Sequence, residues 1–294
     1  MFGFLKNLKK KPSVDFDAVL ESVLRNEISA VASPASANGS PCRSKFGGKP
    51  ALPAGFVWPK YEAADEKGET AARPLSFLCQ INLREVSAYD TENLLPKTGL
   101  LLFFYEQESG CWGFDPEDDG CARVFYFEDV DKLSATALPL DLKEEYVVKE
   151  YDLAFSSKPS YPSYEELEYH SDAICDWDDY DEAVENKGYE INNERHKLLG
   201  YADPIQSEML TECERAMRGL YCGNAESYRK TSKEEAREIE EAARDWTLLF
   251  QMASIEDEDF ELMFGDLGDL YFYIRKQDLK ERRFDKAWLI LQCG

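Results

Sequence analysis

The sequence predicts an α+β protein whose antiparallel β-rich sheets come from a tandem-duplicated unit. Two segments resemble each other: in residues 74–107 and again in 245–277, an apolar run ends in Leu-x-Gln and one more apolar residue, around Gln80 and Gln251. In both, an acidic connector follows and a glycine opens a second, aromatic-rich run. Short continuous apolar runs of this kind are typical of buried strands. Helical patterns at the N-terminus and inside the second unit complete the prediction.

The N-terminal region predicts one helix and one connector. Residues 12–30 place apolar side chains broadly on one face, and Ser13 or Asp15 can cap the helix. Residues 31–44 are rich in Ser, Ala, Pro and Asn, which is typical of an extended connector.

Three strands are predicted in the first unit, over residues 75–83, 99–105 and 122–127. The acidic run at 115–120 begins like a calcium-binding EF-hand loop. Its twelfth position is Tyr126, where such a loop requires a bidentate glutamate. We therefore predict an acidic hairpin loop before the third strand.

The second unit carries two helical patterns and a final strand. Residues 205–219 place apolar side chains on one stripe, and a capping box of Ser232 and Glu235 opens a second helix over 232–246. Residues 285–293 predict the last strand. The two helices account for the greater length of the second unit.

The chain divides by composition into four parts, which we expect to pack as one globular domain. Residues 1–40 form an N-terminal helical segment and connector, and 41–160 form the first β-rich unit. Residues 161–190 form an acidic connector, and 191–294 form the second unit with its helical insertion.

Composition and charge narrow the classes of function. The 294 residues are 44% hydrophobic, enough for a buried core, and no apolar run approaches the ~20 residues of a membrane-spanning helix. A net charge of −24 repels nucleic acid, whose binding depends on basic side chains, and attracts basic partners. We therefore expect a soluble protein that does not bind nucleic acid.

The cysteines and histidines indicate a compartment and argue against zinc. Eight cysteines are scattered without a Cys-x-x-Cys pair, and the N-terminus lacks the apolar core of a secretory signal. We interpret this as a reducing, cytoplasmic setting. The two histidines, His170 and His196, have no paired spacing, so we expect neither a metal site nor a cofactor.

An irregular loop over residues 45–59 is the first candidate binding site. Its three glycines and three prolines exclude a regular helix or a central strand. Glycine pairs also let a ligand approach the backbone closely, but the loop lacks the glycine pattern of a phosphate-binding loop. We favour a fixed structural turn over a ligand cradle, and the residues that a ligand would contact are Lys45, Gly47, Gly48 and Trp58.

The acidic segment over residues 165–190 is the second candidate. It carries eleven acidic residues and one basic residue, Lys187. A solvated, partly mobile connector is the favoured interpretation. The alternatives are a docking surface for a basic partner and a carboxylate site for Mg²⁺ or Ca²⁺. The residues of the docking surface would be Asp176, Trp177, Asp178, Asp179 and Asp181.

The two glutamines of the repeat, Gln80 and Gln251, are predicted to be structural. Each lies in an apolar run, where an amide without hydrogen bonds would be costly. Each should therefore bond to backbone or to its counterpart, and we hypothesise a structural polar pair at the interface of the two units.

These residues together resemble the YwqG-like proteins, a bacterial family described as a domain of unknown function. The resemblance implies a compact α+β fold with an antiparallel sheet, and it supplies no catalytic set. It also implies a role in protein interaction or toxin immunity, of which relatives are suspected from association alone. The matching residues are 44–48, Leu52, Pro53, Trp58, Pro59, 74–83, Leu95, Pro96, 99–104, 198–206, 246–251 and 265–279.

A protein-interaction module of the immunity or adaptor type, with an acidic face for a basic partner, is the function that the sequence favours. No Gly-x-Ser-x-Gly elbow or His-Glu-x-x-His motif is present. Three alternatives stay open: a carboxylate-based hydrolase, a small-ligand-binding protein and a purely structural protein. The hydrolase would require a deep pocket in which several carboxylates converge. The sequence does not indicate an oligomeric state.

Overall fold

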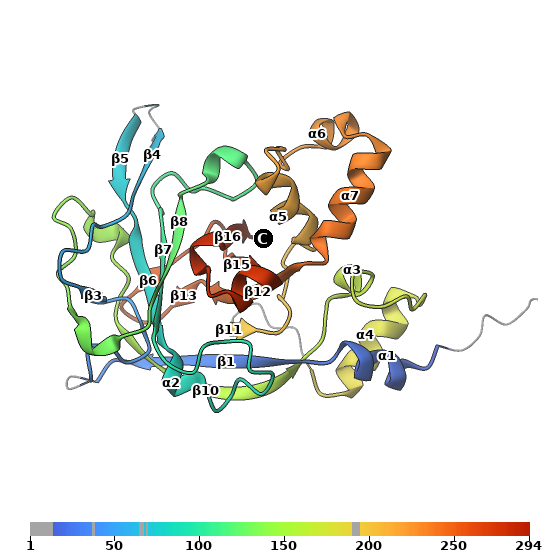
Figure 1. Ribbon diagram of the computed structural model, residues 1–294, viewed down its shortest axis with the longest axis horizontal. Helices are drawn as coiled ribbons and strands as arrows, with labels where there is room; N and C mark the ends of the chain where they lie inside the picture. The colour runs from blue at the N-terminus through green and yellow to red at the C-terminus, as the bar shows by residue number, and fades with distance from the viewer. Residues whose placement is uncertain (1–13, 37–38, 65–67, 69, 190–194) are drawn as a thin grey trace, which may run out of the picture.

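A computed structural model describes residues 14–36, 39–64, 68, 70–189 and 195–294. The chain folds around one ten-stranded antiparallel sheet, which curves until it nearly closes into a barrel (Figure 1). From edge to edge its strands are β16 (Trp288–Gln292), β15 (Asp269–Arg275), β12 (Trp246–Ala253), β11 (His196–Leu199), β1 (Arg25–Pro34), β10 (Tyr151–Ser160), β2 (Lys45–Phe46), β6 (Ser76–Asn82), β7 (Leu100–Tyr105) and β8 (Ala122–Phe127).

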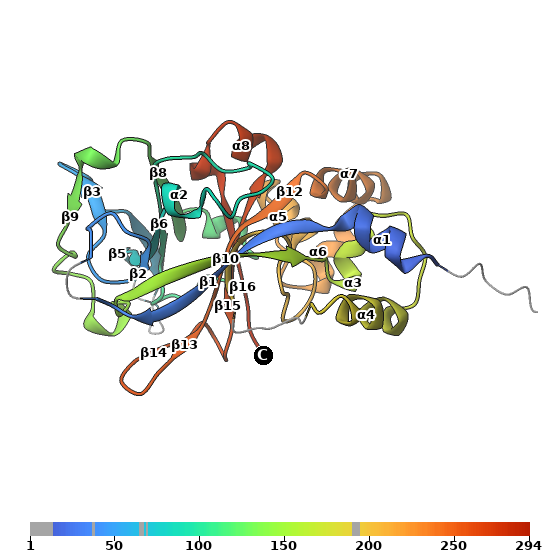
Figure 2. The same cartoon turned by 90° about the horizontal axis from the view of Figure 1, so that it is seen from below.

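Three small two-stranded sheets lie around this large sheet. They pair β3 (Ala51–Pro53) with β9 (Leu133–Ala135), β4 (Lys60–Ala64) with β5 (Thr70–Pro74), and β13 (Ile255–Glu256) with β14 (Glu261–Leu262). The β13–β14 hairpin projects away from the large sheet, as Figure 2 shows.

Most of the helices gather at one end of the molecule (Figure 1). They are α1 (Phe16–Val23), α3 (Tyr164–Leu167), α4 (Trp177–Asn186), α5 (Leu210–Met217), α6 (Ala225–Lys230) and α7 (Lys233–Ala243). Two short helices, α2 (Leu83–Val86) and α8 (Lys276–Lys280), follow strands of the sheet, and single 3₁₀ turns lie at Pro116–Asp118, Val130–Lys132, Glu144–Tyr146 and Phe284–Lys286.

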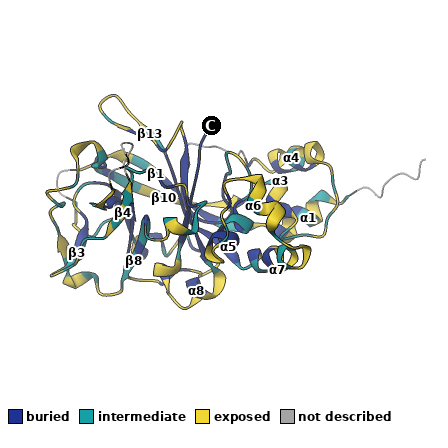
Figure 3. Cartoon of the chain, turned by 90° about the horizontal axis from the view of Figure 1, so that it is seen from above, coloured by how far each residue is buried: buried dark blue, intermediate teal, exposed yellow. Residues whose placement is uncertain are grey.

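The core lies inside the curved sheet, where β7, β12 and β16 are buried on every residue, while β1 and β10 are partly exposed (Figure 3). Phe103 from β7 packs on Phe250 from β12 and Phe272 from β15, with ring centroids 4.6 and 5.1 Å apart. Strands from opposite ends of the sheet order therefore meet across the interior. This contact explains why both predicted runs are apolar on consecutive residues.

The sequence-based prediction of a mixed fold with an antiparallel sheet is confirmed. The predicted strands appear as β6, β7, β8 and β16, and the two predicted helices of the second half appear as α5 and α7. Ser232 caps α7 as expected, because its hydroxyl accepts a hydrogen bond from the Glu235 amide. An additional helix, α6, lies between them and was not predicted.

The predicted N-terminal helix is present and capped by Asp15, but the prediction was wrong beyond Val23. The helix α1 ends at Val23, and residues 25–34 form β1 in the middle of the sheet. This strand bonds to β10 along its whole length and to β11 over four residues. Tertiary pairing on both sides outweighs the weak helical periodicity, which is the usual reason for such an error. The first thirteen residues lie outside the described part of the chain.

Most carboxylates of the acidic segment face solvent, as the sequence predicted, but much of the segment is helical. It forms α3 and α4, which pack with α1 around a cluster that includes Leu20, Val23, Tyr180 and Val184. The buried hydroxyl of Tyr180 donates to the Pro162 carbonyl at 2.9 Å. Apolar side chains spaced among the carboxylates therefore fold this segment against the N-terminal helix.

The two halves of the large sheet are arranged alike. From one edge the strands run β16, β15, β12, β11 and β1, and from the other they run β8, β7, β6, β2 and β10. Lys45 in β2 lies opposite Gln80 in β6, and Lys197 in β11 lies opposite Gln251 in β12. A bulge interrupts the pairing of β6 with β7 beside Phe77, and another interrupts β12 with β15 beside Leu248, at the same place in the repeated pattern. The centre of this arrangement is the contact between β1 and β10.

Candidate functional site

Lys45, Gly47 and Gly48 lie in the centre of the sheet, in contact with the chain's own atoms. The Lys45 ammonium bonds at 2.8 Å to both the Lys49 carbonyl and the Glu150 carboxylate, and the side chain is buried. Both glycines have positive φ, +52° and +66°. A Cβ on Gly48 would lie 1.9 Å from Glu150 Oε2, so its missing side chain admits an internal carboxylate rather than an outside ligand.

Trp58 lies apart from this cluster. Its indole N–H donates to the Leu75 carbonyl at 2.8 Å, and its ring meets Phe104 edge to face at 5.3 Å. These contacts fix the loop on the outer face of β7.

The ion pairs around Lys45 recur around Lys197. Arg43 and Arg195 each precede the lysine by two residues and bond to a glutamate of the central strands, Glu150 directly before β10 and Glu27 in β1. Each lysine bonds to the same glutamate as its arginine. The second cluster is the more deeply buried, because Lys197 and Glu27 are both inaccessible to solvent whereas the Glu150 side chain is 31% exposed.

The two glutamines hold loops, each in its own half of the sheet. Gln80 accepts from the Ala51 amide at 2.9 Å and donates to the carbonyls of Pro41 and Arg43 at 2.7 Å. Gln251 accepts from the Asp203 amide at 3.0 Å and donates to the Asp269 carboxyl at 2.8 Å. The bonds to backbone that the sequence predicted are therefore present, and these bonds do not join the two amides to each other.

The acidic residues proposed for docking lie on α4. Asp178 and Asp179 occupy its first turn, where the helix dipole stabilises negative charge, and Trp177 is 63% exposed. Asp176 precedes the helix and Asp181 is partly buried within it. The residues singled out in the sequence thus occupy three separate places: the sheet centre, the Trp58 cluster and the outer surface of α4.

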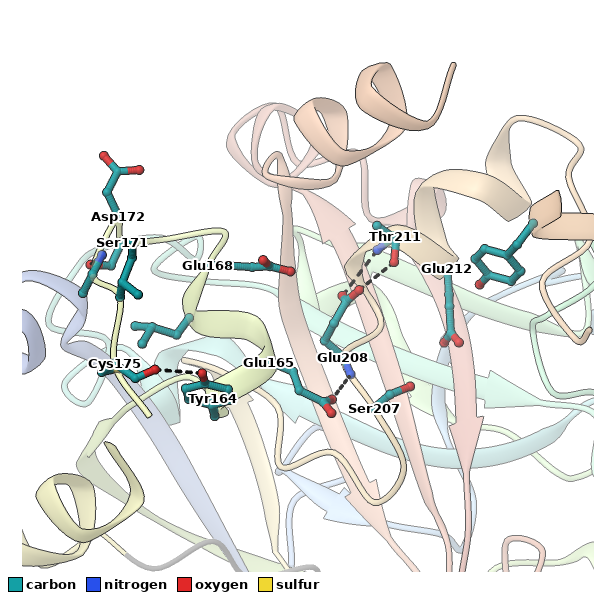
Figure 4. Close-up of a pocket in the computed structure, with 14 residues that line it drawn as sticks. Tyr164, Glu165, Glu168, Ser171, Asp172, Cys175, Ser207, Glu208, Thr211 and Glu212 are labelled. Atoms are coloured by element: carbon teal, nitrogen blue, oxygen red, sulfur yellow. Dashed lines mark hydrogen bonds between the residues drawn. The ribbon is translucent and has the colours of Figure 1, made fainter. Parts of the chain in front are cut away.

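A cleft between the α3 region and the start of α5 brings five carboxylates together (Figure 4). Its volume is about 760 Å³. We call it the acidic cleft and define it by Glu165, Glu168, Asp172, Glu208 and Glu212. In Figure 4, Asp172 and Glu212 lie at opposite ends of the cleft, with Glu165, Glu168 and Glu208 between them.

Glu208 is fixed by the start of α5. One of its carboxylate oxygens accepts from the Leu210 amide at 2.7 Å and the other accepts from the Thr211 hydroxyl at 2.6 Å, so the side chain caps the helix. Its own amide donates to Glu165, which links the two walls of the cleft. Burial raises the pKa of Glu208 above its ordinary value.

The loop that leads into the cleft is anchored by polar side chains of the sheet. Gln251 bonds to the amide of Asp203, and the Tyr271 hydroxyl donates to the carbonyl of the same residue at 2.7 Å. Gln292 accepts from the amides of Ile205 and Gln206 and donates to the Ser207 carbonyl. Gln251 therefore holds the start of this loop at Asp203, and Gln292 holds the residues immediately before Glu208.

Glu212 differs from the other carboxylates of the cleft. Its Oε2 atom is buried and has no hydrogen-bond partner in the part of the chain that the structure describes. Burial, with a smaller contribution from Glu208, raises the pKa of this carboxyl to about 8. No ion pair with a lysine or arginine offsets it among the described residues.

The cleft can attract and hold a positive charge. Carboxylates in a partly desolvated site bind ammonium and guanidinium groups through short, charge-assisted hydrogen bonds. The described residues contain no group of three or more His, Cys, Asp or Glu side chains arranged to hold a metal ion. Binding of an ammonium or guanidinium group by hydrogen bonds is the chemistry that the carboxylates of the cleft offer.

Sequence reasoning overlooked Glu208 and Glu212 because it assigned their region to a helix by its apolar stripe. One signal was present. The two glutamates are spaced i,i+4 at the start of a helix, an arrangement of like charges that is unfavourable without a compensating interaction.

Residues 44–293 match a family described as a domain of unknown function, DUF1963. The chain belongs to this family. No curated protein matches the chain. The DUF1963 region contains all five carboxylates of the acidic cleft, whereas β1 and its Glu27 precede it. None of the helices in the described part of this DUF1963 protein is long and apolar enough to cross a membrane.

Proposed function

We propose that this protein is an interaction module that binds a positively charged side chain of a basic partner protein in the acidic cleft. The observation that carries the proposal is that Glu212, a residue of the cleft lining, has a buried Oε2 atom with no partner within the described chain. A buried polar atom without a hydrogen bond costs free energy, and a bound ammonium group would remove that cost.

Electrostatics favour the same partner. The chain has a net charge of −24, and four more carboxylates surround Glu212 in the cleft. Asp178 and Asp179, in the first turn of α4, add negative charge. They follow Cys175, the last cleft-lining residue of this segment, by three and four residues. A basic partner would therefore be attracted before contact and lose affinity as salt screens the field.

Binding of fluorescein-labelled decalysine, followed by anisotropy, tests the proposal. Glu212→Gln should weaken binding at least about tenfold at about 20 mM salt, since it removes the charge that pairs with the ligand. Glu240→Gln is the matched control, because Glu240 is exposed on α7 and does not line the cleft, so this variant removes a carboxylate outside the proposed site.

The pH dependence sharpens this experiment. Glu212 holds its proton up to a pH of about 8 in the free protein, so a bound cation must displace that proton. Affinity should rise between pH 6 and pH 8 for the wild type and stay nearly flat for Glu212→Gln. Equal losses in Glu212→Gln and Glu240→Gln, with parallel pH profiles, would show that the cleft is not the binding site.

A carboxylate-based hydrolase is the second candidate, because the cleft is a pocket in which several carboxylates converge. Glu212, protonated near neutral pH, has the property of a general acid. A panel of 4-nitrophenyl glycosides tests this function. Release of nitrophenol that disappears in Glu212→Gln would favour the hydrolase over the interaction module.

The setting we propose is cytoplasmic, in an immunity or adaptor role of the kind that the YwqG-like resemblance implies. Eight free thiols support a reducing compartment. We also infer that the two halves of the sheet descend from one duplicated unit. The inference is supported by the matching strand order, bulges, lysine–glutamine pairs and arginine–glutamate pairs.

A further inference from the structure

A second cavity is lined by His196 and by residues of the β13–β14 hairpin and its surroundings. In Figure 2 this hairpin lies apart from α3 and α5, the helices that border the acidic cleft. Its volume is also about 760 Å³. Four apolar side chains line it, those of Ile255, Leu262, Met263 and Leu267, and the ring of His196 forms part of its wall. We call this cavity the hairpin pocket.

His196 has one ring nitrogen engaged and one available. Its Nδ1 accepts a hydrogen bond from the Ala253 amide at 3.1 Å, so in the neutral ring the proton is on Nε2. Burial lowers the pKa of His196 to about 4, which keeps the ring neutral at physiological pH. The side chain is only 8% exposed, and no hydrogen bond to Nε2 is present within the described residues.

The other half of the sheet shows that an imidazole is not needed for the bond to the backbone. Ser44 precedes Lys45 as His196 precedes Lys197, and its hydroxyl accepts from the Asn82 amide at 2.8 Å. Asn82 follows Gln80 by two residues, as Ala253 follows Gln251. A small hydroxyl therefore performs the same structural task, and His196 adds a second polar atom, the Nε2–H donor at the pocket wall.

Charge at the pocket defines the ligand further. Glu256 and Glu258 are exposed beside the cavity, and Asp257 is already paired with Lys149 and the Tyr151 hydroxyl. An anionic ligand would be repelled by these carboxylates. Apolar walls with one buried donor are typical of a site for a small amphipathic molecule.

We propose that the hairpin pocket binds a small neutral amphipathic molecule, whose carbonyl oxygen accepts a hydrogen bond from His196 Nε2–H and whose apolar part packs under the β13–β14 hairpin. His196 is nine-tenths buried and lines a cavity large enough for such a ligand. The proposal is independent of the acidic cleft, because none of its residues lines that cleft.

Nitrogen-15 NMR of the imidazole groups tests the proposal on the full chain. The chain has only two histidines, so the His196 ring signals can be assigned with a His196→Ser variant. The probes are N-benzylacetamide, N-butylacetamide and N-(2-phenylethyl)acetamide, titrated to about 5 mM, a range that detects millimolar dissociation constants. The anion 3-phenylpropionate serves as the matched control for charge.

We expect at least one amide to shift the His196 Nε2 signal to saturation and the anion to leave it unchanged. His196→Ser places at position 196 the residue type that Ser44 provides in the other half of the sheet. Leu267→Asp puts a charge on an exposed residue of the pocket wall. We expect at least one of these variants to fold and to lose amide binding. The proposal is overturned if no amide shifts the His196 signal, or if folded variants bind the amides as the wild type does.

Discussion

Asp269 shows how one residue can carry a stability cost that varies with pH. Its side chain is inaccessible, one oxygen accepts from Gln251 at 2.8 Å, and the other, Oδ1, is buried without a partner in the described chain. Burial raises the pKa of this carboxyl to about 8. In the unfolded chain an aspartate releases its proton near pH 4.

The sign of the effect follows from these two values. Between pH 4 and pH 8 the folded state retains a proton that the unfolded state loses, so this residue's contribution to stability falls as the pH rises through that window. Asp269→Asn keeps an acceptor for Gln251 and cannot ionise. Its thermal midpoint relative to the wild type should therefore increase steadily from pH 5 to pH 8 and level off above that.

Thermal unfolding at five pH values, followed by circular dichroism, measures this difference. Asp266→Asn is the control, because Asp266 lies on the exposed turn a few residues earlier. Parallel curves for Asp269→Asn and the wild type would show that Asp269 is ionised in the folded protein.

For single residues, the sequence showed which polar side chains are buried, but it did not show which of them have an atom free to bind a ligand. An amide inside an apolar run is visible in the sequence, so Gln80 and Gln251 could be assigned structural roles. The importance of Glu212 and His196 could not be deduced, because it depends on which of their atoms lack partners. That information exists only once the chain is folded.

At the scale of elements, each buried glutamine fixes a loop that the sheet alone would not hold. Gln80 bonds to three backbone groups on both sides of β2, and Gln251 bonds to the loop that leads to Glu208. Strands of two to four residues such as β2 and β11 have few ladder bonds of their own. Side-chain bonds from the neighbouring long strand therefore determine where these short strands lie.

Replacing either glutamine by leucine should destabilise the protein, and only the replacement of Gln251 should also weaken ligand binding. Gln80→Leu leaves one amide and two carbonyls without their partner, at a cost on the order of 2–4 kcal/mol, or about 5–10 °C in thermal midpoint. Gln251→Leu should cost a similar amount and also weaken decalysine binding, because it releases the loop before Glu208.

Differential scanning calorimetry and the anisotropy assay together measure both effects. Gln107→Leu, at a partly buried glutamine with one bond to the Tyr146 carbonyl, controls for the loss of an amide. An unchanged midpoint in Gln80→Leu would contradict its anchoring role.

The elements themselves were predictable to different degrees for one physical reason. Strands such as β7 are apolar on every residue, and so short an apolar run is typical of a buried strand. The central strand β1 contains Arg, Asn, Glu and Ser, and becomes a strand because β10 and β11 bond to both of its edges. Pairing between distant segments is not encoded in local periodicity.

At the scale of the whole molecule, the two halves of the sheet share a framework and differ in burial. Lys197 is inaccessible, and its ammonium lies 3.2 Å from Glu27 and 2.8 Å from Asp203, both of which are themselves buried. Lys45 makes the matching contact with Glu150, which remains 31% exposed. The acidic cleft and the hairpin pocket both adjoin the half that contains Lys197.

Matched lysine-to-methionine substitutions test whether this difference in burial governs stability. Lys197→Met should lower the free energy of unfolding by on the order of 3–5 kcal/mol, because it leaves carboxylates buried with one fewer counter-charge. Lys45→Met should cost about 1–2 kcal/mol, since water and Arg43 can still compensate Glu150. Urea unfolding at pH 7 measures both values, and comparable slopes with denaturant are required for the comparison. Equal losses would mean that the two clusters contribute alike, and that the deeper burial of the second half is compensated elsewhere in the sheet.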